Sequence, residues 1–173
     1  MVEAVSSIIT ESVSVSLEGF VFMEAIPLSC KPEEMDDDNF LWANIEIQDP
    51  VKGVITLVFP TLLLNEIIES VYGPMISPDL DPFSDDADLG FPQEEQNGIN
   101  DKMRYDTLAE LVNTFAGQIM SRVVPEDVTF QLGLPVTGEG EAAADEKTGV
   151  FYFQLDEQIF YITVSGDLLA KLI

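Results

Sequence analysis

Apolar residues recur every three to four positions in two long segments of the chain. In residues 2–20 they predict a helix, with an apolar set of Val5, Ile8, Ile9, Val13, Leu17 and Phe20. Val13, Val15 and Leu17 also alternate with serines in the manner of a β-strand, so a strand stays an alternative there. Residues 101–123 carry the most regular helical period in the chain and predict a second long helix.

Runs rich in β-branched and aromatic residues predict the strands. They are LWANIEIQ (41–48), VKGVITLVF (51–59), VTFQLGL (128–134) and GVFYFQLDEQIFYITV (149–164). Asp49-Pro50 joins the first two runs into an antiparallel hairpin, and Asp156-Glu157 supplies the turn of a second hairpin within the last run. The sheet is therefore expected to be built mainly from hairpins.

Two shorter helices complete the pattern. Pro60 and Thr61 open one of them over residues 61–72, and Gly73 is placed to end it. The other follows Gly166. This order of elements predicts an α+β fold, a largely antiparallel sheet with helices packed on one face.

One domain spanning residues 1–173 is expected, because 46% hydrophobic residues over this length suit a single core. Residues 74–101 break every period and are rich in proline and acids, which predicts an acidic, flexible insert. The stretch DLDPFSDDADLG (79–90) lacks the ligand register of an EF-hand loop, so calcium binding is only a minor alternative and no metal site is predicted.

The charge balance narrows the function. The chain has 32 acidic residues against 7 Lys and Arg, a net charge of −25. Nucleic acid is excluded as a partner, because phosphates are held by clustered Lys and Arg, and an anionic membrane surface would be repelled. With no apolar run of 18 residues and no basic segment at the N-terminus, the sequence predicts a soluble, cytoplasmic protein.

The chain has no histidine, so Ser-His and Cys-His nucleophilic schemes cannot operate within it. Cys30 is the only cysteine, which rules out an intrachain disulfide. We expect Cys30 to be a small, partly buried side chain rather than a reactive thiol, since few cations are available to lower its pKa.

The helix predicted over residues 101–123 has two distinct faces. With Leu108 at zero and about 100° per residue, one stripe is apolar and consists of Leu108, Val112, Phe115 and Ile119. Asp106, Glu110, Asn113 and Gly117 fall on the opposite side. Glycine is unfavourable inside a helix, which suggests that another backbone approaches closely at Gly117. The alternative is an ordinary polar helix face.

The run DTLAELVNTFAG (106–117), followed by Pro135, resembles the signature of the CheC/CheX chemotaxis phosphatase family. That signature is Asp or Ser, three residues, Glu, two residues, Asn, then about twenty residues and Pro; here 21 residues separate Asn113 from Pro135. The order of predicted elements outside the acidic insert is also that of a CheX-like chain. Residues 61–72 offer Glu66 and Glu69 but no matching Asn, which implies one site per chain.

The resemblance implies a CheX/CheC-like fold and a hydrolase that dephosphorylates the aspartyl-phosphate of a CheY-like response regulator. Asn113 would position the attacking water and Glu110 would dock the receiver lysine. Asp106, Gly117 and Pro135 would support the site or contact the partner. The chain would bind no cofactor, because the Mg²⁺ belongs to the receiver's own active site. The resemblance also implies a homodimer.

Two other functions stay open. A non-catalytic receiver-binding or flagellar-switch-type adaptor could use the same scaffold, because a fold and a surface motif do not establish turnover. An acidic structural protein, in which the Glu-Asn face has no role, is the third hypothesis.

Overall fold

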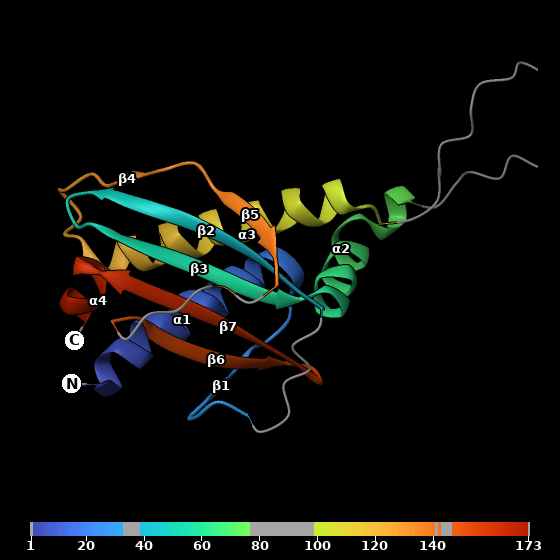
Figure 1. The fold of residues 1–173 in the computed structure, drawn as a ribbon, viewed down its shortest axis with the longest axis horizontal. Helices are drawn as coiled ribbons and strands as arrows, with labels where there is room; N and C mark the ends of the chain where they lie inside the picture. Colours follow the sequence, from blue (N-terminus) through green and yellow to red (C-terminus); the bar gives the residue numbers. More distant parts are fainter. Residues whose placement is uncertain (1, 33–38, 77–98, 141, 143–146, 173) are drawn as a thin grey trace, which may run out of the picture.

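The computed structural model describes residues 2–32, 39–76, 99–140, 142 and 147–172, which form a seven-stranded antiparallel sheet and four helices (Figure 1). The helices are α1 (Val2–Val21), α2 (Thr61–Ile76), α3 (Asp101–Val123) and α4 (Asp167–Leu172). The strands are β1 (Ile26–Leu28), β2 (Phe40–Asp49), β3 (Gly53–Pro60), β4 (Gln131–Leu132), β5 (Val136–Glu139), β6 (Gly149–Leu155) and β7 (Gln158–Gly166). The α+β fold class predicted from the sequence is confirmed.

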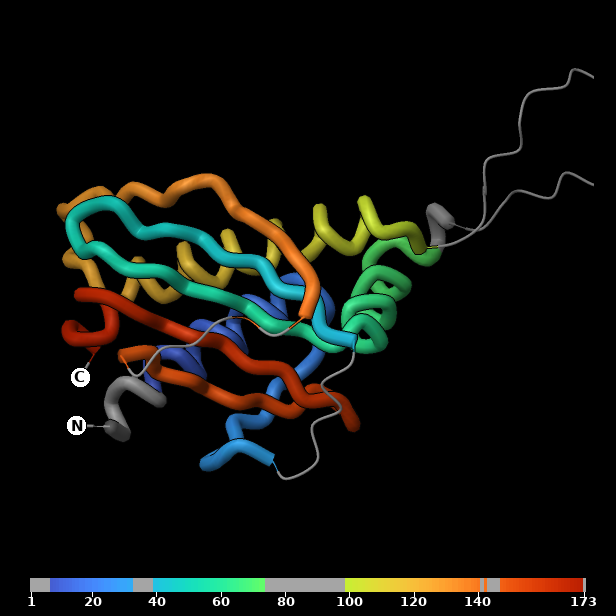
Figure 2. The backbone as a smooth tube through the Cα atoms, viewed as in Figure 1, coloured from blue at the N-terminus to red at the C-terminus, as the bar shows by residue number. Residues whose placement is uncertain are grey.

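The core lies between the sheet and the two long helices, α1 and α3, which run along one face (Figures 1 and 2). Alternate strand residues point into this layer. Ile45 pairs with Ile55, which pairs in turn with Val164, so one row of fully buried aliphatic side chains crosses three strands. The shorter helices α2 and α4 follow β3 and β7 directly, and because these strands are antiparallel the two helices lie at opposite ends of the sheet.

The helix expected over residues 2–20 is confirmed as α1, in spite of the strand-like alternation of its serines. Ser12 and Ser16 are buried, and their hydroxyls donate to the carbonyls of Ile8 and Ser12 at 2.7 Å. Each buried hydroxyl therefore finds its partner one turn back in the same helix, which removes the cost of burying it unpaired. Among the described residues, no helix is both long and apolar enough to span a membrane.

Both predicted hairpins form, and the strand predicted over 128–134 is limited to Gln131–Leu132. Two further local predictions were wrong, and one strand was missed. Gly73 does not end its helix, because it lacks the positive φ of a glycine cap and α2 continues to Ile76. The segment β5 was not predicted as a strand, yet it pairs with β2. Cys30 is exposed rather than partly buried, since it follows the short edge strand β1. Of the expected acidic insert (74–101), residues 77–98 lie outside the described residues.

The two halves of the chain repeat one order of elements that the sequence does not reveal. The first half runs α1, β1, β2, β3, α2, and the second runs α3, β4 and β5, β6, β7, α4. The second strands of the central hairpins, β3 and β7, pair with each other, while β1 adds to the second hairpin and β5 to the first. The structural counterpart of α3 is therefore α1.

We expect Gly53→Ala to destabilise the fold, because a Cβ at Gly53 would lie 2.5 Å from the Ser165 carbonyl oxygen and 2.8 Å from the Cβ of buried Leu168. Overpacking of this kind costs about 1–3 kcal/mol. Gly19→Ala is the matched control: Gly19 lies in α1 with open space around it, so alanine should raise the free energy of unfolding by about 0.5–1 kcal/mol. Urea unfolding measures both, and equal effects would contradict the packing argument.

Candidate functional site

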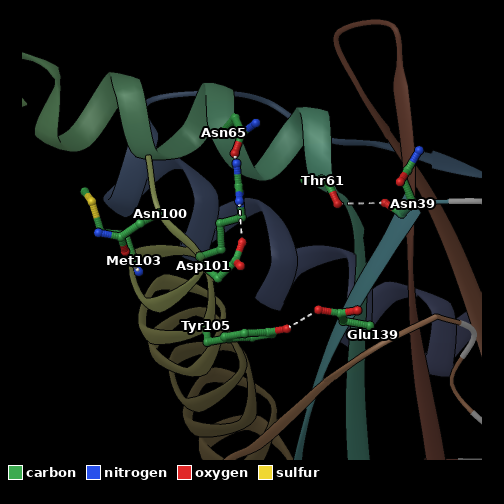
Figure 3. A network of polar contacts seen from close by, with 9 residues as sticks. Asn39, Thr61, Asn65, Asn100, Asp101, Met103, Tyr105 and Glu139 are labelled. Atoms are coloured by element: carbon green, nitrogen blue, oxygen red, sulfur yellow. Dashed lines mark hydrogen bonds and ion pairs between the residues drawn. The ribbon is translucent and has the colours of Figure 1, made fainter. Parts of the chain in front are cut away.

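The candidate residues lie on α3, whose start is fixed by a side-chain cap. Asn100 precedes the helix, and its Oδ1 accepts a hydrogen bond of 2.9 Å from the Met103 backbone N–H (Figure 3). Such a cap satisfies one of the backbone donors that a helix leaves free at its N-terminus. From there α3 continues without interruption for 23 residues, which carries its outer face past the whole length of the candidate motif.

The apolar stripe predicted for α3 is confirmed. Leu108, Val112, Phe115 and Ile119 are all fully buried, and Leu111, Ala116 and Met120 widen the buried face. Asp106, Glu110 and Asn113 are exposed, and Gly117 is half-buried. The structure thus brings these four residues together along one outward stripe.

Glu110 and Asn113 are the two polar side chains of this stripe that have no interaction. Within the described part of the chain, neither side chain makes a hydrogen bond or an ion pair. They are three residues apart, so their side chains are neighbours on the helix surface. An acceptor-only carboxylate and an amide that can both donate and accept therefore stand side by side and open to solvent.

Asp106 differs from Glu110 because it has a partner. The Lys102 Nζ lies 2.7 Å from Asp106 Oδ2, one helical turn away, and this hydrogen bond together with the carboxylate charge raises the pKa of Lys102. Both groups are mostly exposed, so the pair adds little stability. Its consequence is electrostatic: of the two acids on the stripe, only Glu110 presents an uncompensated charge.

The expected close approach of another backbone at Gly117 does not occur within the described chain. A Cβ built at Gly117 would meet nothing within 4 Å. The space over this glycine is open, so any close approach has to come from outside the described residues.

Pro135 is half-buried and lies between β4 and β5, in the segment that runs back beside α3 (Figure 1). The Tyr105 hydroxyl donates to Glu139 Oε1 at 2.5 Å and joins the first turns of α3 to the end of β5 (Figure 3). Four extended residues back from Glu139 span about 13 Å, which equals roughly nine residues of helix. An extended segment of this length that runs along α3 would bring Pro135 about level with Asn113.

A pocket of about 470 Å³ opens at the N-terminal end of α3. Arg104 lines it and is already held in place: its Nε donates to Asn65 Oδ1 at 2.9 Å and its Nη1 to Asp101 Oδ1 at 2.6 Å (Figure 3). Asp101 and Glu139 also line the pocket, so its acids outnumber its one cation. An anionic ligand would therefore be disfavoured there.

Neither a metal site nor the calcium alternative finds support in the described residues. No three His, Cys, Asp or Glu side chains lie close enough there to hold an ion. The acidic stretch 79–90, where calcium was the alternative, lies outside the described residues.

The helix α1 presents a degenerate version of the same stripe. Shifting α3 by 99 positions superimposes its buried pattern on that of α1, so that Ser7, Glu11 and Ser14 take the places of Asp106, Glu110 and Asn113. Serine stands where α3 has the amide. The sequence comparison with residues 61–72 used a helix that is not the counterpart of α3; the actual counterpart, α1, contains no Asn either.

Sequence reasoning missed Tyr105 and Glu139. They are 34 residues apart. Tyr105 lies on the predicted helix α3, whereas Glu139 lies on β5, a strand that the sequence did not predict. Trp42 was missed with them: its ring lies against Gly138, and its Nε1 donates to the Glu139 carbonyl at 3.2 Å. A contact of this kind has no local signal, because it exists only once β2, β5 and α3 are assembled.

No protein-family model and no curated protein matches the sequence. Solved structures do match. CheX from Vibrio vulnificus is 16% identical with a TM-score of 0.65, over 92% of this chain and 93% of that one.

Two further solved structures share this fold. A chain of the CheX-CheY-BeF3-Mg²⁺ complex from Borrelia burgdorferi is 15% identical with a TM-score of 0.62, over 92% of this chain and 95% of that one. FliY from Thermotoga maritima is 15% identical with a TM-score of 0.59, over 97% and 89%. The chain therefore has the fold of the CheX and CheC-like chemotaxis proteins.

Proposed function

We propose that this chain is a phosphatase that removes the phosphoryl group from the aspartyl-phosphate of a CheY-like response regulator. The observation that carries the proposal is the pair of exposed, unengaged side chains of Glu110 and Asn113 on the outer face of α3. The signature around them and the fold shared with CheX support the same partner, since a CheX structure exists in complex with CheY, BeF3 and Mg²⁺.

Phosphoryl transfer mainly rewards positioning and charge stabilisation, which suits a chain without histidine. Asn113 would hold a water in line with the phosphorus, its Oδ1 accepting a hydrogen bond from that water. The water oxygen would attack phosphorus as the bond to the aspartate oxygen breaks. The receiver aspartate would leave as a carboxylate, and the inorganic phosphate formed would keep both protons of the water. A carboxylate in place of Asn113 would repel the phosphoryl oxygens. Mg²⁺ is supplied in the partner receiver's active site, and this chain contributes no cofactor.

Glu110 would dock the receiver by pairing with the ammonium group of its active-site lysine. Glu110 suits this docking role better than Asp106, because the Asp106 carboxylate is already paired with Lys102. Because Glu110 and Asn113 are one turn apart on a rigid helix, an ion pair at the first fixes the distance of the second from the phosphorus. Pro135 would flank the water-positioning amide. We also propose that the protein works in the cytoplasm as a homodimer.

The second candidate is a receiver-binding adaptor without turnover, which the similarity to FliY favours. The two are separated by adding a catalytic amount of this chain to receiver domains of the same genome, each phosphorylated with acetyl phosphate and then freed of excess donor. Repeated turnover supports the phosphatase. Binding of a receiver with stoichiometric protection, or with no change in decay, contradicts the phosphatase and supports the adaptor.

Asn113→Ala should slow dephosphorylation by something like the ~10²-fold typical of losing one positioning group, while receiver binding is retained. Asn113→Asp keeps the size of the side chain but adds a charge, so it should be equally slow. Decay of radiolabelled receiver phosphate measures the rate, and titration with the BeF3⁻-activated receiver measures affinity. Full activity of Asn113→Ala would refute the mechanism.

Glu110→Lys should weaken binding of the activated receiver at least tenfold, because a charge pair becomes a like-charge contact. Glu66→Lys is the matched control, since Glu66 is an exposed glutamate on α2, away from the stripe. Surface plasmon resonance at two salt concentrations checks both variants. If the two reversals weaken binding equally, only net charge matters and Glu110 is not the docking residue.

Gly117→Ala should stabilise the fold by about 0.5–1 kcal/mol and yet slow dephosphorylation, because the new methyl group would occupy the open surface that the receiver backbone approaches. Gly19→Ala makes the same chemical change in α1 and should stabilise without slowing the reaction. Thermal unfolding and phosphate release measure the two effects. A Gly117→Ala variant that is more stable and fully active would show that no partner approaches there.

A further inference from the structure

The hydrogen bond between Tyr105 and Glu139 is a long-range link at the border of the proposed site. The Tyr105 hydroxyl donates to Glu139 Oε1 at 2.5 Å, and this bond is the main reason that the pKa of Tyr105 is raised. It joins the second turn of α3 to the last residue of β5 (Figure 3). Neither residue belongs to the signature that identified the site.

The strand β5 is held on its other side by β2. Trp42 pairs with Gly138, its ring occupies the space that a side chain at Gly138 would need, and its Nε1 donates to the Glu139 carbonyl at 3.2 Å. Glu139 is thus held by its backbone from the sheet and by its side chain from α3. These two contacts fix the distance between α3 and β5, although β5 has only four residues.

The distance between β5 and α3 also affects the position of Pro135, which directly precedes β5. Side chains alternate along a strand, so Thr137 and Glu139 share the face of β5 that turns toward α3, and Pro135, one residue before β5 begins, would continue that face. On the helix, Ala109 and Ala116 lie between the directions of Tyr105 and Asn113, by about 100° per residue. These small side chains leave room for the strand segment to lie close to α3, on the side where Asn113 emerges.

Asn113 needs such a neighbour. Its side chain is exposed and has no hydrogen bond in the described part of the chain, so no hydrogen bond there fixes its rotamer. A proline ring about level with it would limit the directions that the amide can take. An amide that rotates freely is only seldom oriented to hold a water in line with the phosphorus.

We infer that Tyr105 and Glu139 are positioning residues of the proposed dephosphorylation site: their hydrogen bond sets the distance of β5 from α3 and so holds Pro135 beside Asn113. The inference rests on the proposed function. Neither residue touches the phosphoryl group, and their effect passes through Pro135 to the amide.

The test is Tyr105→Phe, which removes only the hydroxyl group. With this protein in saturating excess over the phosphorylated receiver, the single-turnover rate of dephosphorylation should fall about 3- to 10-fold. This is less than the ~10²-fold loss that a 1 Å misplacement can cause. Affinity for the BeF3⁻-activated receiver should stay within about twofold, because Glu110 is unaffected. Glu139→Ala should match Tyr105→Phe, the double variant should be no slower than either, and Glu139→Gln should recover most of the rate because it keeps an acceptor oxygen.

Thr61→Val is the matched control. Thr61 lines the same pocket and donates to the Asn39 carbonyl at 2.9 Å, a bond of similar exposure that does not involve α3. It should leave the rate unchanged. A lower melting temperature for Tyr105→Phe with an unchanged single-turnover rate would reduce the link to a structural role and overturn the inference.

A second readout keeps the inference separate from the proposed function. In amide-resolved NMR spectra, the side-chain NH₂ of Asn113 should become more mobile in Tyr105→Phe than in the wild type, whether or not any receiver is hydrolysed. Unchanged mobility of that group overturns the inference. A wild-type chain that hydrolyses no receiver overturns the proposed function, while the mobility result still decides whether Tyr105 positions Asn113.

Discussion

The burial of one side of α3 against the sheet determines what the protein presents to a partner. Leu108 and Phe115 are fully buried on this side, and a rotation of the helix by one residue would begin to move them out and Glu110 in. Burying an unpaired carboxylate is far more costly than any gain from the rotation. The direction of Glu110 and Asn113 is therefore a result of core packing, and no local hydrogen bond is needed to hold the stripe outward.

The charges on α3 are distributed unevenly with respect to that stripe. Three of the seven cationic residues of the chain lie on α3, and each has a partner: Lys102 with Asp106, Arg104 with Asp101, and Arg122 with Glu11. Of the three acids on α3, Glu110 is the one without a cation partner in the described part of the chain. The net charge of −25 attracts basic groups to the whole protein surface, and the unpaired Glu110 carboxylate adds one localised anion on α3.

The parts of the fold that could be predicted were those whose signal is local. The 23-residue period of α3 and the apolar runs around Asp49-Pro50 and Asp156-Glu157 are each readable within one segment. The strand β5 was missed because it has only four residues, of which Gly138 and Glu139 are poor strand formers, and it is a strand only because β2 pairs with it.

The site divides in the same way. The four stripe residues follow from helical spacing and the signature, whereas Tyr105 and Glu139 meet only through the assembled sheet. The equivalence of α1 and α3 was hidden too, since it lies in a buried pattern carried by different residues, such as Ser16 in place of Phe115.

The crossed strands of the two halves also constrain how the chain acquires its fold. The first hairpin takes its outer neighbour, β5, from the second half, and the second hairpin takes β1 from the first. Neither half has a complete set of strand partners by itself, so the described sheet is completed only when strands of both halves pair. During synthesis the N-terminal hairpin stays open at one edge until residues beyond Val136 emerge, and folding of this domain is expected to be slow because so many of its pairings are non-local.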